Sequence, residues 1–271
     1  MAIVTLTTDF GTVDGYVGAM KGVILAIAPE ARLVDLTHEV PPQDVRAAAF
    51  ALMRAVPFYP SGSIHCVVVD PGVGTARRPV VLRTAKGQLL VGPDSGVFTL
   101  FLPPFTEREP DAIELTESQW WRAPASDVSA TFHGRDIFAP VAAHLASITD
   151  GGEVELARLG RSASELARFD MPAPIEERGG WRGEVVSVDH FGNAITNLPE
   201  RGVAEMGTDV WIEVGDHELP LVRTYSDVEV GELCALVSSS GWLEIAEREG
   251  SAADRLGLAP GIPILLKCGD R

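Results

Sequence analysis

Three aspartates, Asp9, Asp70 and Asp189, each follow an apolar, β-branched segment and precede a glycine-containing loop. In open α/β sheets, ligands bind beyond the carboxyl ends of the strands, so Asp9 and Asp70 could meet at one crevice. Aspartate also opens turns and caps helices for structural reasons. Three occurrences in the same context nevertheless favour a site in which carboxylates accept protons or hold a cationic ligand.

A second polar segment, residues 131–136, lies directly before a predicted helix and contains His133. An imidazole at this point can carry a proton, donate a hydrogen bond or occupy a turn. The six histidines form no HxH, HxxxH or HExxH pattern, so we expect no zinc site. A Mg²⁺ site built from the carboxylates of Asp9, Asp70 and Asp136 remains open, and with it a metal-dependent phosphoesterase.

The glycine-rich segments do not match the common nucleotide-binding motifs. Residues 72–74 (Gly-Val-Gly) lack dinucleotide and Walker spacing, and the first strand–helix connection, residues 11–15, contains Asp14, which would repel a phosphate. The serine-rich turn at 238–242 lacks a GxSxG elbow, which argues against a serine hydrolase. We therefore expect neither NAD nor ATP, and no bound cofactor.

The elements that must position these residues alternate in the first half of the chain. Helical spacing of apolar residues predicts helices over 16–28, 43–56 and 135–148. Apolar runs predict strands over 3–8, 32–36, 63–69, 79–83 and 88–91, the last two pairing as a hairpin. This order predicts a three-layer α/β domain with a mostly parallel sheet.

The pattern changes after about residue 175. Residues 169–180 are rich in Pro, Gly and Glu without a period, and short strands with turn signals follow them. We expect an α/β domain over 1–170, a linker over 171–180 and a small antiparallel β-barrel domain over 181–271.

Composition narrows the class of ligand and the compartment. The 271 residues are 46% hydrophobic and 22% charged, which is typical of a globular chain. A net charge of −16 argues against binding to nucleic acid or an anionic membrane and suits a neutral or cationic ligand. The N-terminus has no basic signal region, no apolar run is long enough to span a bilayer, and the three cysteines are widely spaced. We expect a cytoplasmic protein with free thiols.

Six motifs in order give the chain a family resemblance. They are TTDFGTVDGYVGAMKG, VVVDPGVGTARRPVV, PDSGVF, TFHGRDIFAPVAAHLA, VDHFGNAITN and SSSGWLEIA. Together they resemble the S-adenosyl-L-methionine (SAM) hydroxide adenosyltransferases, relatives of the SAM-dependent fluorinase and chlorinase. The resemblance implies an α/β domain followed by an antiparallel β-barrel. It also implies a homotrimer with SAM bound between the N-terminal domain of one subunit and the C-terminal domain of the next.

The activity implied by the resemblance is metal-independent hydrolysis of SAM to adenosine and L-methionine, by attack of an activated water at the ribose C5′ carbon. The implied catalytic set is Asp70, Arg77 and His133. The halogenating relatives lack that aspartate and histidine, so water is favoured over halide.

The resemblance also implies nine substrate-binding residues. Asp9 and Asp14 would hold the ribose and sulfonium region, and Phe132 and Gly134 would line the reacting centre. The adenine and the amino-acid end of SAM would be bound by Phe191, Asn193 and Tyr225 and by Asp189 and Ser239 respectively. Ser240 stands where the halogenases have arginine, so carboxylate recognition is expected to differ. A non-catalytic sensor of SAM or adenosine remains a further alternative, which predicts binding without release of adenosine.

Overall fold

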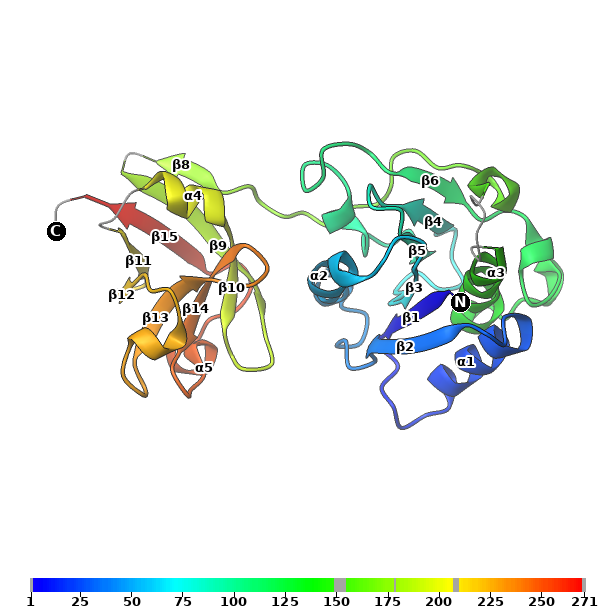
Figure 1. Cartoon of the computed structure of the whole chain (residues 1–271), viewed down its shortest axis with the longest axis horizontal. Helices are drawn as coiled ribbons and strands as arrows, with labels where there is room; N and C mark the ends of the chain where they lie inside the picture. Colours follow the sequence, from blue (N-terminus) through cyan, green and yellow to red (C-terminus); the bar gives the residue numbers. More distant parts are fainter. Residues whose placement is uncertain (1, 149–154, 178, 207–209, 270–271) are drawn as a thin grey trace. The chain divides into compact units, whose positions relative to one another are not determined.

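The computed structural model describes residues 2–148, 155–177, 179–206 and 210–269. The chain divides into two compact units, residues 1–169 and 170–271, which Figure 1 draws in blue to green and in yellow-green to red. Each unit has its own hydrophobic core. Among the described residues, no helix has both the length and the apolar character needed to cross a membrane.

The N-terminal unit is built on a seven-stranded mixed sheet with the order β2-β1-β3-β5-β4-β6-β7. Its first four strands in this order run parallel, and the remaining pairs are antiparallel. The strands are β1 (Ile3–Thr8), β2 (Arg32–Thr37), β3 (Ile64–Val68), β4 (Pro79–Arg83), β5 (Leu89–Pro93), β6 (Asp111–Glu114) and β7 (Arg161–Ser162). The predicted fold class and the β4–β5 hairpin are confirmed, and β6 and β7 extend the antiparallel half further than the sequence pattern indicated.

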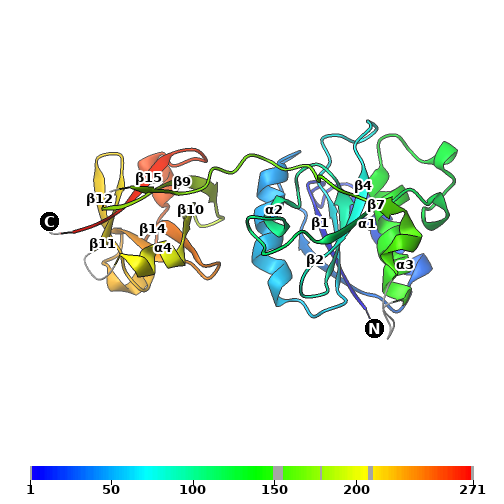
Figure 2. The ribbon, with the colours of Figure 1, turned by 90° about the horizontal axis from the view of Figure 1, so that it is seen from above.

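Helices cover both faces of this sheet, as the turned view in Figure 2 shows. Helices α1 (Tyr16–Ile27) and α3 (Ala139–Ile148) pack on one face, and α2 (Val45–Ala55) packs on the other. The central strand β3 is buried along its whole length, because its alternate side chains enter the two cores. The helix predicted to begin at residue 135 starts instead with a π-helical turn, Gly134–Phe138, which leads into α3.

The C-terminal unit is an antiparallel sheet of eight strands that curls into a nearly closed barrel. A bridge between Leu221 and Ala235 links the two end strands of the path, β12 and β13. The strands are β8 (Ile175–Glu177), β9 (Gly180–Val188), β10 (Ala194–Pro199), β11 (Val210–Val214), β12 (His217–Pro220), β13 (Leu233–Val237), β14 (Trp242–Glu247) and β15 (Pro263–Cys268). Two short helices, α4 (Glu200–Glu205) and α5 (Ala252–Leu256), accompany them.

The segment expected to be a linker without regular structure contains strand β8. Strand β10 pairs with β9 only over residues 185–188, so the first residues of β9 have a free edge, and β8 pairs with them over residues 180–182. Unpaired strand edges favour such pairing. A tertiary partner therefore gave this segment a structure that its own sequence pattern did not indicate.

Candidate active site

Asp9 and Asp70 leave the sheet at the same edge. Strands β1 and β3 are parallel neighbours in which Thr8 pairs with Val68, so the residues that follow both strands lie beyond their carboxyl ends. This is the edge at which ligands bind in open α/β sheets. The structure thus places the two aspartates where the sequence pattern predicted them.

The Asp70 carboxylate is held by the guanidinium of Arg77. Nε of Arg77 donates to Oδ1 of Asp70 at 3.0 Å, and Nη2 donates to Oδ2. Both side chains are only 6% exposed, so this bidentate pair is buried. A Cβ on Gly72 would lie 3.2 Å from Cβ of Arg77, so glycine at this position lets the arginine side chain fold back toward Asp70.

The third member of the predicted set, His133, lies against the same guanidinium. Nη2 of Arg77 is 2.9 Å from Nδ1 of His133. Because arginine can only donate, Nδ1 must accept and the ring proton must sit on Nε2. Burial and the positive charge of Arg77 lower the pKa of His133, and the carboxylates of Asp70 and Asp136 oppose this only partly. His133 is therefore a neutral imidazole with an Nε2–H donor.

The π-helical turn that follows His133 packs closely on the sheet. A Cβ on Gly134 would lie 3.2 Å from both Sδ of Met20 and Cγ1 of Val68, so a larger residue here would require these side chains to shift by a few tenths of an ångström. In the same turn, the ring of Phe138 lies 5.3 Å from the guanidinium carbon of Arg77. Such turns are frequent at functional sites, and this one brings His133 to the arginine from a distant part of the chain.

One donor of the site is unused. Across the described part of the chain, Nη1 of Arg77 is buried and has no hydrogen-bond partner. A buried donor without a partner costs about 1–3 kcal/mol, so such an atom is expected to meet a polar ligand or a water molecule. Together with Nε2–H of His133, it provides two donors next to a carboxylate.

An aromatic cluster that sequence reasoning missed lies at the start of α1 and around Phe132. The ring centroids of Phe10 and Tyr16 lie 5.8 Å and 5.3 Å from that of Phe132. Tyr16 is 50% exposed, although large apolar surfaces are normally buried. The sequence did contain a signal: Tyr16 is an aromatic residue in the first turn of a predicted helix, and it does not belong to the helix's set of regularly spaced apolar residues.

The other predicted residues of this unit are more exposed. Oδ2 of Asp9 accepts a hydrogen bond from the backbone N–H of Gln43 at 2.7 Å, which ties the β1–α1 connection to the segment before α2. Asp14 is exposed in the loop that leads into α1.

In the C-terminal unit, Asp189 organises the connection between β9 and β10. Its Oδ1 accepts from the backbone N–H groups of Phe191 and Asn193, both at 2.9 Å, and its Oδ2 accepts from the Asn193 side chain at 3.1 Å. Asn193 is buried, whereas Phe191 is 73% exposed. The carboxylate therefore shapes a loop that presents an aromatic ring to solvent.

Tyr225 and Ser239 complete the predicted set. The Tyr225 hydroxyl donates to the buried carboxylate of Glu244 on β14, and burial together with this carboxylate raises the pKa of Tyr225. Ser239 is exposed in the β13–β14 turn, which the Glu200–Gly241 backbone hydrogen bond holds at the carboxyl end of β10. The Asp189 loop precedes the other end of β10, so the two residues expected at the amino-acid end of SAM flank opposite ends of this strand.

The carboxylates considered for a Mg²⁺ site do not form one. Asp70 is paired with Arg77 and Asp9 with the Gln43 N–H, while Asp136 is bound by Arg122 and Arg135. In the described ranges no three acidic, histidine or cysteine side chains are grouped as metal ligands. Asp136 is thus placed in a structural ion cluster, which does not favour the phosphoesterase alternative.

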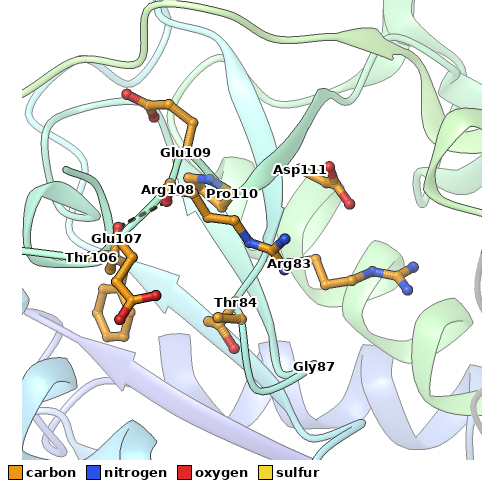
Figure 3. A pocket seen from close by; sticks show the side chains of 11 residues that line it. Arg83, Thr84, Gly87, Thr106, Glu107, Arg108, Glu109, Pro110 and Asp111 are labelled. Carbon is orange, nitrogen blue, oxygen red and sulfur yellow. Dashed lines mark hydrogen bonds between the residues drawn. The ribbon is translucent and has the colours of Figure 1, made fainter.

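A cavity of about 690 Å³ lies elsewhere in the N-terminal unit (Figure 3). Its lining comes from the end of β4, the β4–β5 turn and the loop before β6, and includes Arg83, Thr84, Glu107, Arg108 and Asp111. The β4–β5 turn precedes β5, which is parallel to β3, so the cavity belongs to the opposite edge of the sheet from Asp70. It contains none of the predicted site residues.

An α/β unit with a buried Asp–Arg–His cluster at its sheet edge, followed by an antiparallel β-barrel, defines a two-domain class of small-molecule enzyme. The chain belongs to the SAM hydroxide adenosyltransferase family: the N-terminal and C-terminal domain models of this family match residues 4–155 and 183–265.

Three comparisons illustrate the relationship. The chain is 42% identical to an (R)-S-adenosyl-L-methionine hydrolase of Salinispora tropica, over 98% of both chains. A fluorinase of Actinoplanes sp. is 28% identical over 97% of this chain and 96% of its own. The crystal structure of an uncharacterized conserved protein from Thermotoga maritima superposes with a TM-score of 0.86 and 37% identity, over 97% of this chain and 99% of that one.

Proposed function

We propose that this protein hydrolyses S-adenosyl-L-methionine to adenosine and L-methionine. The observation that carries the proposal is the buried Asp70–Arg77–His133 cluster, whose one guanidinium joins a carboxylate and a neutral imidazole. Relatives with 40–42% identity over nearly the whole chain are named (R)-SAM hydrolase, and we propose the same (R) form of SAM as the substrate here.

The chemistry suits these groups. The SAM sulfur is positively charged, so displacement at the ribose C5′ carbon releases methionine as a neutral thioether that needs no proton. The demanding requirement is a nucleophilic oxygen at neutral pH. A water molecule beside Asp70 can transfer a proton to its carboxylate. Nη1 of Arg77 and Nε2–H of His133 then stabilise the hydroxide that develops.

Positioning supplies much of the remaining rate. Holding water in line behind C5′ makes the reaction effectively unimolecular, and well-aligned reactions gain up to roughly 7–11 kcal/mol in this way. Phe132, whose ring packs on Phe10 and Tyr16, and Gly134 are the proposed lining of the reacting centre. Asp9 and Asp14 are proposed to hold the ribose and sulfonium region. The methionine leaving group needs neither a proton nor electrons, and this supports a reaction without a cofactor.

The C-terminal unit is proposed to hold the two ends of SAM. Phe191, Asn193 and Tyr225 are assigned to the adenine, because an exposed ring beside a buried amide suits stacking and hydrogen bonding to a nucleobase. Asp189 and Ser239 are assigned to the amino-acid end. These two residues flank opposite ends of β10, a separation that one amino-acid group does not span, so their joint assignment rests on the family resemblance alone. Ser240, beside Ser239, forms a hydroxyl–hydroxyl hydrogen bond with Ser238 at 2.7 Å.

We further propose a cytoplasmic homotrimer in which the N-terminal unit of one subunit and the C-terminal unit of the next enclose each substrate. The family resemblance supports the trimer. Free thiols at Cys66, Cys234 and Cys268 suit a reducing compartment. Light scattering after size-exclusion chromatography tests the trimer directly, and a monomer at micromolar concentration contradicts it.

The function is tested by incubating the purified protein with SAM and separating the products by chromatography. Adenosine and methionine must appear in equal amounts and in proportion to enzyme. Saturable SAM binding without adenosine would instead support the sensor, and a halogenated nucleoside in the presence of halide would support a halogenase. Hydrolysis of a generic phosphate ester without adenosine release would support the phosphoesterase.

A further inference from the structure

A completely buried carboxylate, that of Asp136, lies within the π-helical turn next to the reacting centre. Nε of Arg122 donates to its Oδ1 at 2.5 Å, and Nε and Nη2 of Arg135 donate to Oδ1 and Oδ2 at 2.6 Å and 2.9 Å. The backbone N–H of Ser129 donates to Oδ2 at 2.9 Å. Burial opposes ionisation of this carboxyl, but the arginine hydrogen bonds outweigh it and hold the pKa of Asp136 well below its usual range.

These hydrogen bonds fasten a segment that has little structure of its own. Between residues 122 and 133 the only helical turn is the short Ala125–Asp127, and no strand is formed. The backbone N–H of Arg122 donates to the Asp136 carbonyl at 2.9 Å, and the Asp136 N–H donates to the Phe132 carbonyl at 3.2 Å. Asp136 therefore fixes the beginning, middle and end of the segment through its side chain and backbone together.

The end of this segment carries Phe132, which is proposed to line the reacting centre, and leads directly to His133, which is proposed to act on water. The guanidinium carbon of Arg135 lies 5.0 Å from the centre of the Phe132 ring, so the same arginine contacts Asp136 and Phe132. His133 follows directly and meets Arg77 at 2.9 Å through Nδ1. A displacement of the segment by 1 Å would break this bond, and misplacements of about this size can cost roughly a hundredfold in rate.

We propose that Asp136 is a positioning residue for the hydrolytic reaction: it sets the place of Phe132 and His133 without touching substrate. This inference rests on the proposed function for its kinetic consequence, but the placement of His133 can be tested without substrate. The alternative to this proposal is that the Asp136 carboxylate contributes only to the stability of the fold.

The pKa of His133 distinguishes positioning from a direct charge effect. The charged groups that act on this imidazole are Arg77 and Asp70, from the loop after β3, and Asp136. The Asp136 charge by itself raises the pKa of His133, so its removal with the ring held in place would lower that pKa. If the ring instead leaves Arg77 and its buried position, both influences that lower the pKa are lost, and the pKa rises toward its ordinary value of about 6.5.

The experiment uses Asp136→Asn, which keeps the shape of the side chain. One carboxylate oxygen, an acceptor, becomes an NH₂ group that faces arginine donors. NMR titration of the His133 ring in the substrate-free protein should show the pKa rising and the Nε2–H tautomer losing its dominance. At neutral pH, kcat for SAM should fall about tenfold to a hundredfold, with KM changed less than about threefold. The matched control is Asp127→Asn in the same segment, an exposed carboxylate that accepts a hydrogen bond from the neighbouring Ser126.

Arg122→Gln and Arg135→Gln provide the test if Asp136→Asn does not fold, because each removes one arginine partner and leaves the other. Both should move the His133 signals and lower kcat in the same direction. A His133 pKa that falls or stays the same, with kcat within about twofold of wild type in the variants that fold despite a lower melting temperature, would overturn the proposal. If the wild-type protein releases no adenosine, the proposed function fails, while the NMR titration still decides whether Asp136 positions His133.

Discussion

Arg77 donates to Nδ1 of His133 across 2.9 Å, and this contact fixes the imidazole as the tautomer with its proton on Nε2. The same Nη2 atom also bonds the Asp70 carboxylate. One guanidinium thus determines the orientation of both the proposed proton acceptor and the proposed donor. In the proposed reaction, His133 would donate a hydrogen bond and Asp70 would receive the proton of water.

Asp70→Asn should abolish most of the turnover while leaving SAM bound. The amide cannot take a proton, and loss of a general base typically costs about a hundredfold or more. Its NH₂ group also faces a donor of Arg77, so the contact with the arginine is weakened as well. The measurement is single-turnover release of adenosine, together with SAM affinity by calorimetry. Glu114→Gln, which removes the exposed Arg161 ion pair, is the control. A rate for Asp70→Asn within a few fold of wild type contradicts the assignment.

Arg77→Gln should destabilise the N-terminal unit as well as inactivate the enzyme. Removal of one partner of a buried ion pair leaves the other charge uncompensated, which typically costs about 3–5 kcal/mol. The free energy of unfolding by urea measures this loss. Arg161→Gln removes a guanidinium of the same type from a side chain that is 72% exposed and should have a much smaller effect. Equal effects of the two substitutions would mean that the Asp70–Arg77 pair is not buried in solution.

Phe191→Ala should raise KM for SAM with little change in kcat. Stacking of a base on an aromatic ring contributes about 1–3 kcal/mol, which corresponds to a rise of roughly 5- to 150-fold. Phe58→Ala is the matched control, because that ring is 82% exposed in the other unit and lies on a short turn after α2. Steady-state kinetics on both variants measure the effect. An unchanged KM for Phe191→Ala would contradict stacking of adenine on this ring.

Stability should depend on pH through His65, a histidine outside the proposed site. This ring is fully buried on β3, its Nδ1 lies 2.8 Å from Oγ1 of Thr5, and burial lowers its pKa to about 4. The unfolded chain, with a pKa near 6.5, binds the proton first. The free energy of unfolding contributed by His65 is therefore complete above about pH 6.5 and is lost as the pH falls toward 4, by at most about 3 kcal/mol.

The measurement is urea unfolding of wild type and His65→Gln across this range of pH. The difference between the two proteins should shrink as the pH falls, because the variant has no imidazole to protonate. A difference that stays constant from pH 7 to about 4 would show that His65 does not titrate in the unfolding equilibrium.

Removal of divalent metal should leave SAM hydrolysis unchanged. The carboxylates of Asp9, Asp70 and Asp136 already accept hydrogen bonds from protein donors, and the thioether leaving group needs no Lewis acid. Activity after exhaustive dialysis against EDTA, measured with and without added Mg²⁺, checks this. A loss on chelation that Mg²⁺ restores would favour a metal-dependent enzyme instead.

The strand-end aspartates show what the sequence could predict. Apolar strands followed by Asp and Gly place Asp9 and Asp70 at one sheet edge, since parallel neighbours end together, and the structure has both there. The roles of Arg77 and His133 came from the family resemblance alone. Their contact depends on a reversal of the chain after Gly72 and on the π-helical turn. Neither feature produces a periodic pattern of apolar residues from which it could be predicted.

Asp136 shows why the remainder could not be predicted. Its residue type and its position before a helix suited a metal ligand equally well. What decides its role is the return of residues 122 and 129 to the same carboxylate, and that segment contains no regular element from which its path could be inferred. Strand β8 is similar, because its pairing depends on a free edge of β9 that exists only once the barrel forms.

The most direct test of the central idea follows the oxygen atom. When the enzyme turns over SAM in water enriched in heavy oxygen, mass spectrometry should find one heavy oxygen in the 5′-hydroxyl of adenosine and none in methionine, and Asp70→Asn should suppress both products together. Adenosine without the label, or no adenosine at all, would contradict attack of an Asp70-activated water on C5′.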